Sequence, residues 1–347
     1  MDAEAVEYRK RVFCADLALG DQVDEVFCVT RVERRLGRNG TPFLRLSVSD
    51  RTGTLAAVAW DGVEDLLEVL TEGGYARVRA EVGDYRDELQ LRVVGAEAVT
   101  ARLDPVDFLP RGPMSGEESV AAIREFVLSF ADPDLRGLVL DFLDDARFSR
   151  AFTAAPAAKV NHHAYVGGLA EHTLSVMRLC AMAAEHYGDL DRDLLLAGAF
   201  CHDIGKIAEL AVEPGFPYTE EGGLLGHIPI GFVMVREQIA RRPDFPAERA
   251  TDLGHLVLSH QGELEWGSPV EPQTLEALVL HFLDNLDSKV GSARPHLAGV
   301  GQGEGGRTGY VRSLRRSLFR RGSPVPPTGL LESGEPALFD GLDRPPD

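Results

Sequence analysis

The sequence predicts an all-β barrel at the N-terminal end of the chain, followed by an all-helical domain. Two observations carry this prediction, and the length agrees with it. Residues 21–100 contain short β-branched segments, partly alternating between apolar and polar positions and separated by turn signals. After Pro105 the apolar residues recur at intervals of three and four, which is typical of helices. The 347 residues fit about two domains and a tail.

Five strands and one short helix are expected in the barrel. The strands are expected at residues 23–35, 42–51, 54–62, 75–85 and 88–99. The helix is expected within residues 61–74. A five-stranded barrel with a helix between its third and fourth strands has the element order of the OB-fold. We therefore expect an OB-fold at residues 21–104, preceded by an N-terminal extension of residues 1–20.

Helix start signals mark the second half of the chain. Ser115 and Glu118 have the spacing of a capping box ahead of an apolar face. Asp132 and Pro133 form a second start signal, an N-cap residue followed by a first-turn proline. Behind the barrel we expect a helical connector, a helical domain and a tail, at residues 105–150, 151–290 and 291–347.

The tail is rich in Gly and Pro. Residues 291–306 show no periodicity. Residues 307–321 carry six arginines and no acid, and their apolar residues have helical spacing, which predicts a short basic helix. We expect the residues after this segment to be disordered.

The composition excludes several classes of protein. No apolar run reaches the ~18–20 residues of a membrane helix, and the acidic start is unlike a signal peptide. We therefore expect a soluble cytoplasmic protein without a membrane partner. Four cysteines without a CxxC pair are typical of reduced, buried thiols. The formal net charge of −19 repels nucleic acid at long range, so composition alone favours a small-molecule substrate.

Histidines gather in the helical part of the chain, where nine of the ten lie between His162 and His281. His202 and Asp203 directly follow an apolar helix, and Asp284 directly follows the apolar run LVLHFL. A carboxylate in such surroundings is costly unless it is paired or bound to metal. Imidazole and carboxylate are the ligands that Zn, Mn, Fe and other divalent ions bind. The sequence therefore predicts a metal site.

The order of these residues resembles the HD-domain metallophosphohydrolases. The positions concerned are His172, His202, Asp203 and Asp284. The resemblance implies that these four residues hold one divalent ion. Members with further histidines hold a second ion, with the central Asp bridging both, and His227 and His260 are the candidates here. Asp203 would then be a catalytic residue as well as a ligand.

Two assignments within this set stay open. His255 is a weaker candidate for the second ion. Asp287 is an alternative to Asp284 as the distal ligand, and we prefer Asp284 because it directly follows the apolar run, as the family Asp does.

Longer motifs narrow the resemblance to the YhaM-type 3′–5′ exoribonucleases, a family that places an OB-fold before the HD domain. The helical motifs are NHHAYVGGLAEHTLSV, LLLAGAFCHDIGKIAEL, LLGHIPIG, LSHQGELEWGSP and LHFLDNLDSKV. The barrel motifs are NGTPFLRLSVSDRTGTLAAVAWD and YRDELQLRV. The similarity covers roughly residues 10–321. One departure is His260-Gln261, where the family often has two adjacent histidines, so we assign a metal role to His260 only.

Basic residues are candidates for contacts with phosphate. Lys206 is one of only four lysines and follows Asp203 by about one helical turn. We expect it to be a catalytic phosphate contact, the alternative being a solvated lysine at a helix end.

Arginines cluster at the first barrel strand and the following loop, where OB-folds bind single strands. The candidate RNA-binding residues are Arg31, Arg34, Arg35, Arg38 and Phe43, with Arg45 nearby. Trp60 and Tyr85 are further candidates for stacking on bases. Small barrels also bury aromatic residues in their cores, and that alternative stays open.

The residues together predict a metal-dependent phosphodiesterase with two divalent ions, of which one lowers the pKa of bound water towards ~7. The resemblance implies that the substrate is single-stranded RNA trimmed from its 3′ end. Mn is the ion expected first, with Co, Fe, Zn and Ni as alternatives. DNA as substrate and a homo-oligomeric state stay open.

Two other functions remain. One is an HD-domain hydrolase of nucleotides or cyclic nucleotides, which the net charge of −19 favours. The other is a non-catalytic nucleic-acid-binding protein, against which the intact His/Asp set argues.

Overall fold

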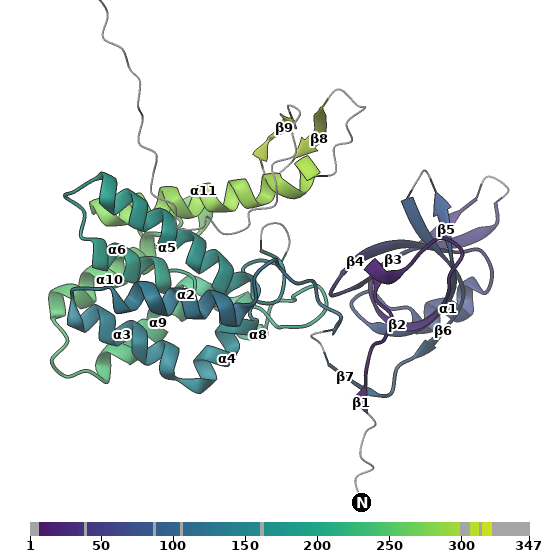
Figure 1. Ribbon diagram of the computed structural model, residues 1–347, viewed down its shortest axis with the longest axis horizontal. Coiled ribbons are helices and arrows are strands. Elements are labelled where there is room, and N and C mark those ends of the chain that lie inside the picture. The colour runs from purple at the N-terminus through teal and green to yellow at the C-terminus, as the bar shows by residue number, and fades with distance from the viewer. Residues whose placement is uncertain are drawn as a thin grey trace, which may run out of the picture. The chain divides into compact units, whose positions relative to one another are not determined.

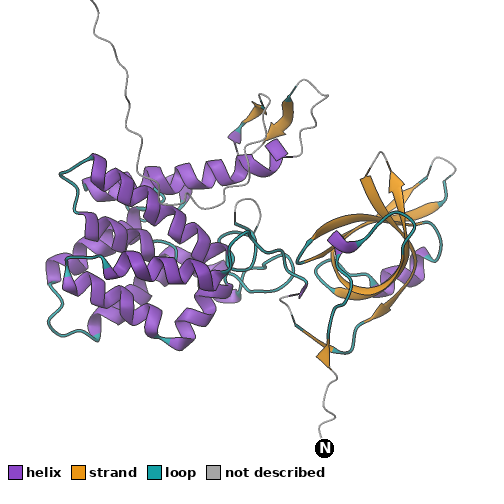
Figure 2. Cartoon of the chain, in the orientation of Figure 1, coloured by secondary structure: helices purple, strands orange, loops and turns teal. Residues whose placement is uncertain are grey.

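The computed structural model describes residues 7–37, 40–85, 88–104, 107–159, 163–298, 306–311 and 314–320. Within these residues it contains a β-barrel, a helical domain and a short C-terminal hairpin (Figures 1 and 2). No helix in the described part of the chain is long and apolar enough to cross a membrane.

The barrel has the predicted strands. They are β2 (Gln22–Leu36), β3 (Pro42–Asp50), β4 (Gly53–Ala59), β5 (Tyr75–Tyr85) and β6 (Glu88–Ala98). They close in the order β2-β3-β4-β6-β5, with β4 and β6 parallel and the other described pairs antiparallel. The predicted helix is α1 (Val63–Val69), between β4 and β5. This order of elements confirms the OB-fold.

Alternation along the strands builds the barrel core. In β5, for example, every second residue from Ala76 to Val82 is buried, which places the apolar side chains on one face of the strand. Beyond a bulge between Val29 and Arg31, β2 pairs only with β3. Three residues of the predicted arginine cluster, Arg31, Arg34 and Arg35, lie on this last part of β2.

Residues of the expected N-terminal extension pack against the barrel. The strand β1 (Glu7–Tyr8) pairs with β7 (Arg102–Leu103), and a 3-10 turn, η1 (Cys14–Asp16), follows. The amino group of Lys10 donates to the carbonyl of Val26 at 2.6 Å and lies 3.4 Å from the carboxylate of Asp50. Both side chains of this ion pair are fully buried. Burial lowers the pKa of Lys10, although Asp50 acts in the opposite direction.

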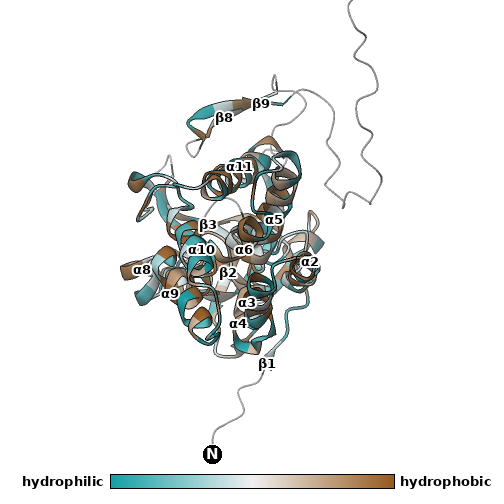
Figure 3. Cartoon of the chain, turned by 90° about the vertical axis from the view of Figure 1, so that its left-hand side faces the viewer, coloured by the Kyte–Doolittle hydropathy of each residue, from teal (hydrophilic) through white to brown (hydrophobic). Residues whose placement is uncertain are grey.

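The helical domain consists of α2 (Gly116–Leu128), α3 (Pro133–Asp144), α4 (Ala146–Ala154), α5 (Gly168–His186), α6 (Arg192–Cys201), α7 (Lys206–Glu209), α8 (Glu220–Leu225), α9 (His227–Ala240), α10 (Ala247–Ser259), the 3-10 turn η3 (Leu264–Trp266) and α11 (Leu275–Ala298). At its centre α6 contacts α5, α10 and α3 (Figure 3). Every residue of α6 from Asp193 to Cys201 is buried. This helix leads the chain directly to His202 and Asp203.

Both predicted helix starts are confirmed. Ser115 accepts from the backbone N–H of Glu118, whose carboxylate accepts from the N–H of Ser115. Asp132 caps α3 ahead of Pro133. Because α2, α3 and α4 share one hydrophobic core with α5 and α6, the segment expected as a connector is packed into the helical domain.

Two expectations for the tail are wrong. The helix α11 continues past Val290 to Ala298, into the segment in which no periodicity was expected. Residues 307–321 were expected to form a basic helix, but they contain the antiparallel strands β8 (Arg307–Val311) and β9 (Arg316–Phe319). The side-chain oxygen of Thr308 accepts from the N–H of Leu318 and helps to hold the two strands. Residues 321–347, including those expected to be disordered, lie outside the described residues.

Candidate metal centre

Four side chains from α5, the end of α6 and α11 bring their ligand atoms together. The Nε2 atom of His172 lies 3.2 Å from Nε2 of His202, 3.5 Å from Oδ2 of Asp203 and 3.2 Å from Oδ1 of Asp284. Ligands held at ~2.1 Å around one ion are separated from each other by about 3.0–3.4 Å. The spacing of this first group therefore fits a single divalent ion.

A second group forms around the other oxygen of Asp203. Its Oδ1 atom lies 3.3 Å from Nε2 of His227 and 3.6 Å from Nε2 of His260. Asp203 Oδ1 and His227 Nε2 are buried, and neither has a hydrogen-bond partner within the described residues. Buried polar atoms are rarely left without a partner, and an ion between them would satisfy both. The residues present therefore fit a second ion, with Asp203 between the two groups.

Two of the imidazoles are oriented by the backbone. His202 ends α6 and His260 ends α10. Each Nδ1 donates to the carbonyl three residues earlier, His202 to Ala199 and His260 to Val257, both at 2.8 Å. These bonds leave both Nε2 atoms available for an ion.

The other two imidazoles are oriented by carboxylates. Nδ1 of His172 donates to Asp287 at 2.8 Å, and Nδ1 of His227 donates to Glu209 at 3.0 Å. Such a carboxylate fixes the tautomer of a ligand histidine and raises its basicity. The geometry thus separates the two candidates for the distal ligand, because Asp284 faces the Nε2 side of His172 and Asp287 the Nδ1 side.

The side chains of the cluster shift one another's pKa values towards the charged forms. Burial would raise the pKa of Asp203, but Lys206, His202 and His260 together outweigh this effect and hold it well below its usual value. Burial would also raise the pKa of Asp284, but the hydrogen bond with His172 and the charges of His202 and His172 together lower it to about 2. Conversely, burial would lower the pKa of His172, yet Asp284 and its neighbours raise it to about 10. Both carboxylates are therefore ionised at neutral pH, as metal ligands must be.

Lys206 lies against the first group of ligands. Its amino group donates to Oδ2 of Asp203 at 2.6 Å, and only 12% of its side chain is exposed. It is therefore not a solvated lysine at a helix end.

Three further residues lie outside the two groups of ligands. Nε2 of His255 accepts from the backbone N–H of Gln273, outside the two groups. His281 donates from Nδ1 to the carbonyl of His260, behind the ligand. Gln261, where the family often has histidine, has its amide nitrogen 3.4 Å from Nε2 of His260.

Comparisons with known proteins agree with this geometry. Residues 169–289 match the family model of the HD domain. The 3′–5′ exoribonuclease YhaM of Geobacillus sp. (strain WCH70) is 36% identical over 310 residues, which cover 87% of this chain and 94% of that protein.

This chain belongs to the YhaM family of 3′–5′ exoribonucleases.

The YhaM protein of Bacillus velezensis is similarly related, at 35% identity over 78% of this chain and 86% of its own length. Among solved structures, the second OB-fold domain of replication protein A from Methanococcus maripaludis matches 28% of this chain over its full length. Its sequence identity is 18% and its TM-score is 0.21. The assignment to the YhaM family therefore rests on the sequence relatives.

Sequence reasoning missed several residues that support the YhaM-type site. Glu209 was not considered, although it is an acid between the apolar residues of IAEL. His163 was not among the candidate site residues, but its Nε2 lies 3.3 Å from Asp287. Ser175 also donates to Asp287, one turn after His172 in α5. The available signal for His163 was its place in the family motif NHHAYVGG.

The arginines of the barrel lie beside acidic partners. Arg31 and Arg35 both pair with Glu33, and Arg34 pairs with Glu64 at 2.9 Å. All three arginine side chains are about half exposed, so they can exchange these partners for phosphate. Arg38 lies outside the described residues.

An aromatic pair lies on the same barrel. The ring of Phe43 stacks on Trp60, with centroids 4.7 Å apart. Trp60 and Tyr85 are exposed and Phe43 is half-buried, so none of the three is a core residue of the barrel.

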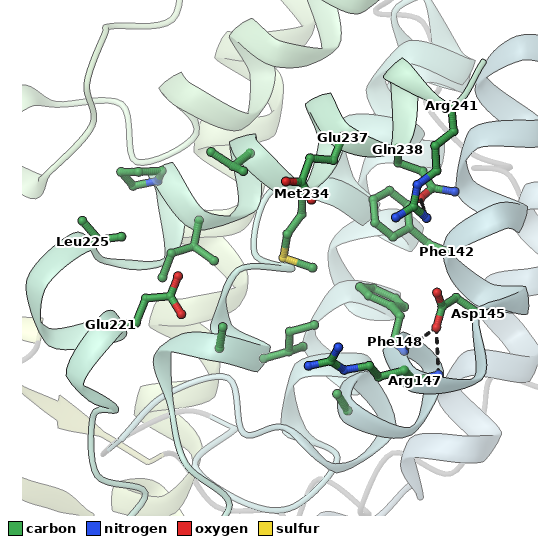
Figure 4. A pocket seen from close by; sticks show the side chains of 16 residues that line it. Phe142, Asp145, Arg147, Phe148, Glu221, Leu225, Met234, Glu237, Gln238 and Arg241 are labelled. Carbon is green, nitrogen blue, oxygen red and sulfur yellow. Dashed lines mark hydrogen bonds between the residues drawn. The ribbon is translucent and has the colours of Figure 1, made fainter. Parts of the chain in front are cut away.

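A cavity of about 890 Å³ beside α7 and α8 has no histidine or aspartate among its described lining residues. Two other cavities in the helical domain are candidates for the site. The larger of these two, about 650 Å³, is a mainly apolar groove between the ends of α3 and α4 and the helices α7–α9 (Figure 4). The described residues that line it include no histidine, and its Asp145 is engaged in capping α4 (Figure 4). The smaller, about 360 Å³, is lined by Asp203, Lys206 and Asp284. The smaller cavity is therefore the candidate active site, because candidate metal ligands line it.

Proposed function

We propose that this chain hydrolyses phosphodiester bonds of single-stranded RNA from the 3′ end, with two divalent ions. The observation that carries the proposal is the position of Asp203, which presents one oxygen to each of two groups of imidazoles. Two-metal phosphoryl-transfer sites hold their ions about 3.5–4 Å apart, a separation that one bridging carboxylate can span. When bound, the ions would polarise the phosphoryl oxygens and activate a water molecule.

Different residues would hold the first ion, the second ion and the substrate. His172, His202 and Asp284 would hold the first ion and His227 and His260 the second, with Asp203 on both. Asp287 and Glu209 would keep two of the imidazoles in the ligand tautomer. Lys206 would contact a phosphate oxygen, since its amino group already lies beside the first group.

RNA as substrate is supported by the relatives and by the barrel. The YhaM relatives are named as 3′–5′ exoribonucleases. Between residues 31 and 45 there are five arginines and one glutamate, in a chain whose net charge is −19. Single-strand-binding barrels combine basic residues with aromatic side chains on which bases stack, and here Phe43 stacks on the exposed Trp60. We propose Mn as the preferred ion because the ligands mix carboxylate with imidazole; Co, Fe, Zn and Ni remain alternatives.

We also propose that the protein works in the cytoplasm. All four cysteines are free and buried. Burial raises the pKa of Cys14 to about 12 and that of Cys28 to about 11, which leaves few thiolates to oxidise. Reduced thiols of this kind persist in a reducing compartment.

The test uses one oligonucleotide labelled at either end, with Mn added. With a 3′ label, the earliest product should be a labelled mononucleotide. With a 5′ label, a ladder should shorten one nucleotide at a time. A DNA strand of the same sequence measures the preference for RNA. Internal cuts, or no cleavage of either strand with any of the five metals, would contradict the proposal.

Hydrolysis of free nucleotides is the second candidate, because the net charge of −19 and a cavity of about 360 Å³ suit a small substrate. Nucleoside triphosphates and cyclic nucleotides in the same assay distinguish the two. Faster turnover of these than of the oligonucleotide would favour the second candidate.

A further inference from the structure

Residues of different chemistry line the cavity beside the metal centre. Asp203 and Asp284 are among them, and the amino group of Lys206 donates to Asp203. Trp266, which belongs to the turn η3, also lines the cavity. The volume of about 360 Å³ lies at the lower end of the range for small-molecule sites, roughly 300–1,000 Å³. It is therefore suited to a single small unit with one charged end and one flat apolar end.

The backbone that carries Trp266 is held firmly. The buried hydroxyl of Ser268 donates to the carbonyl of Leu258 in α10, at 3.0 Å. At the other end of the turn, Gly262 has a φ of +82° and packs on His281, whose ring would lie 2.2 Å from an added Cβ. These contacts attach the turn to α10, which ends at the ligand His260, and to α11, which carries the ligand Asp284.

The ring of Trp266 is open to solvent in spite of this fixed backbone. The residue is 56% exposed. Its aromatic neighbour is His281, whose ring centre is 6.0 Å away and tilted by 41°. A large aromatic side chain that is rigidly presented at the mouth of a site is a platform for a flat ligand.

We propose that this cavity binds one nucleoside monophosphate unit, the 3′-terminal nucleotide of the strand, with its base stacked on Trp266 and its phosphate at the metal ligands and Lys206. The choice of a strand end rests on the proposed function, whereas the recognition of a nucleotide rests on the charged and aromatic residues that line the cavity. Every base presents a π-face, so stacking on Trp266 accepts all four bases. The site would therefore fix the position of the last nucleotide whichever base it carries.

The first experiment measures cleavage of a dinucleotide. Trp266→Ala should raise KM by roughly 5- to 150-fold, which is the loss expected for one base–aromatic stack. Trp266→Phe should restore most of the affinity. The matched control is Leu264→Ala, on the same turn and 60% exposed, which does not line the cavity. It should leave KM unchanged.

The second experiment does not depend on turnover. The chain has two tryptophans, Trp60 and Trp266, so the full-length Trp60→Phe variant reports on Trp266 alone. Adding AMP in the presence of Mn should quench its fluorescence in a saturable way. Inorganic phosphate should cause little quenching by itself and should displace AMP. In the Trp266→Phe variant, where Trp60 is the reporter, AMP should have no comparable effect.

The outcomes separate the nucleotide site from the exonuclease function. RNA cleavage by the wild type without quenching in Trp60→Phe, or with an unchanged KM in Trp266→Ala, would overturn the nucleotide site alone. Quenching without RNA cleavage would support the nucleotide site and reject the exonuclease. If neither quenching nor RNA cleavage is observed, both the nucleotide site and the exonuclease function are rejected.

Discussion

Asp203 faces both groups of ligands with a different carboxylate oxygen. Its Oδ2 faces His172 and His202, and its Oδ1 faces His227 and His260. The sequence predicts this set because the carboxylates follow apolar helices and the residues occur in the family order. It does not predict the partners on the Nδ1 side. Asp287 and His172, for example, are 115 residues apart, and only the fold shows that they meet.

Replacing Asp203 tests its role as the shared ligand. Asp203→Asn keeps the size of the side chain and removes its charge, so hydrolysis should fall by at least about 10³-fold. Circular dichroism should show that the helices remain. His255→Gln is the control, since His255 lies on α10 outside both groups. Comparable turnover by Asp203→Asn and the wild type would contradict the assignment.

Asp287 is expected to position His172 rather than to bind the ion. Asp287→Asn should weaken Mn binding by about 10- to 100-fold, because the imidazole loses the carboxylate that fixes its tautomer. Calorimetry measures the Kd, and excess Mn should restore most of the activity. An unchanged Kd, or a loss of activity that excess Mn does not repair, would show that the residue acts in another way.

At the scale of elements, the ends of strands and helices were predictable where the residues that define them are close in sequence. Capping residues and turn glycines lie within a few residues of the ends that they define, and these strands and helices were predicted. The hairpin β8–β9 was not, because Val311, Leu314 and Leu318 have spacings that a helix also shows. The pairing of β8 with β9 decides the structure there, and no local pattern shows it. The packing of the expected connector has no local signal either, since it depends on helices further along the chain.

The buried pair of Lys10 and Asp50 predicts how the N-terminal segment stabilises the barrel. Lys10→Met leaves the Asp50 carboxylate buried without its cation, which should cost about 3–5 kcal/mol of barrel stability. Urea unfolding followed by Trp60 fluorescence, in a Trp266→Phe background, measures it. Arg77→Met removes the exposed pair with Asp24 and should change the stability little. If the two variants unfold alike, the buried pair does not stabilise the barrel.

At the scale of the whole molecule, we expect the barrel to supply affinity for RNA and the helical domain to supply the chemistry. The net charge of −19 opposes nucleic-acid binding, so affinity must come from a few local sites. The barrel offers exposed arginines and the pair of Phe43 and Trp60. The helical domain offers the metal ligands.

Neutralising the arginine cluster tests this division. Changing Arg31, Arg34, Arg35 and Arg38 to Gln should weaken binding to long RNA and lower the salt dependence by roughly 0.7 per lost phosphate contact. Cleavage of a dinucleotide should change little. Arg77→Gln with Arg79→Gln, on β5 of the same barrel, is the control. Equal losses on long and short substrates would mean that the cluster acts on folding or on the site.

Diffraction from crystals soaked in Mn²⁺, measured at the manganese absorption edge, tests the central claim most directly. We expect two anomalous peaks about 3.5–4 Å apart, one on each oxygen of Asp203. The first should lie within ~2.0–2.3 Å of ligand atoms from His172, His202 and Asp284, and the second at the same range from His227 and His260. A single peak, or peaks that do not share Asp203, would contradict it.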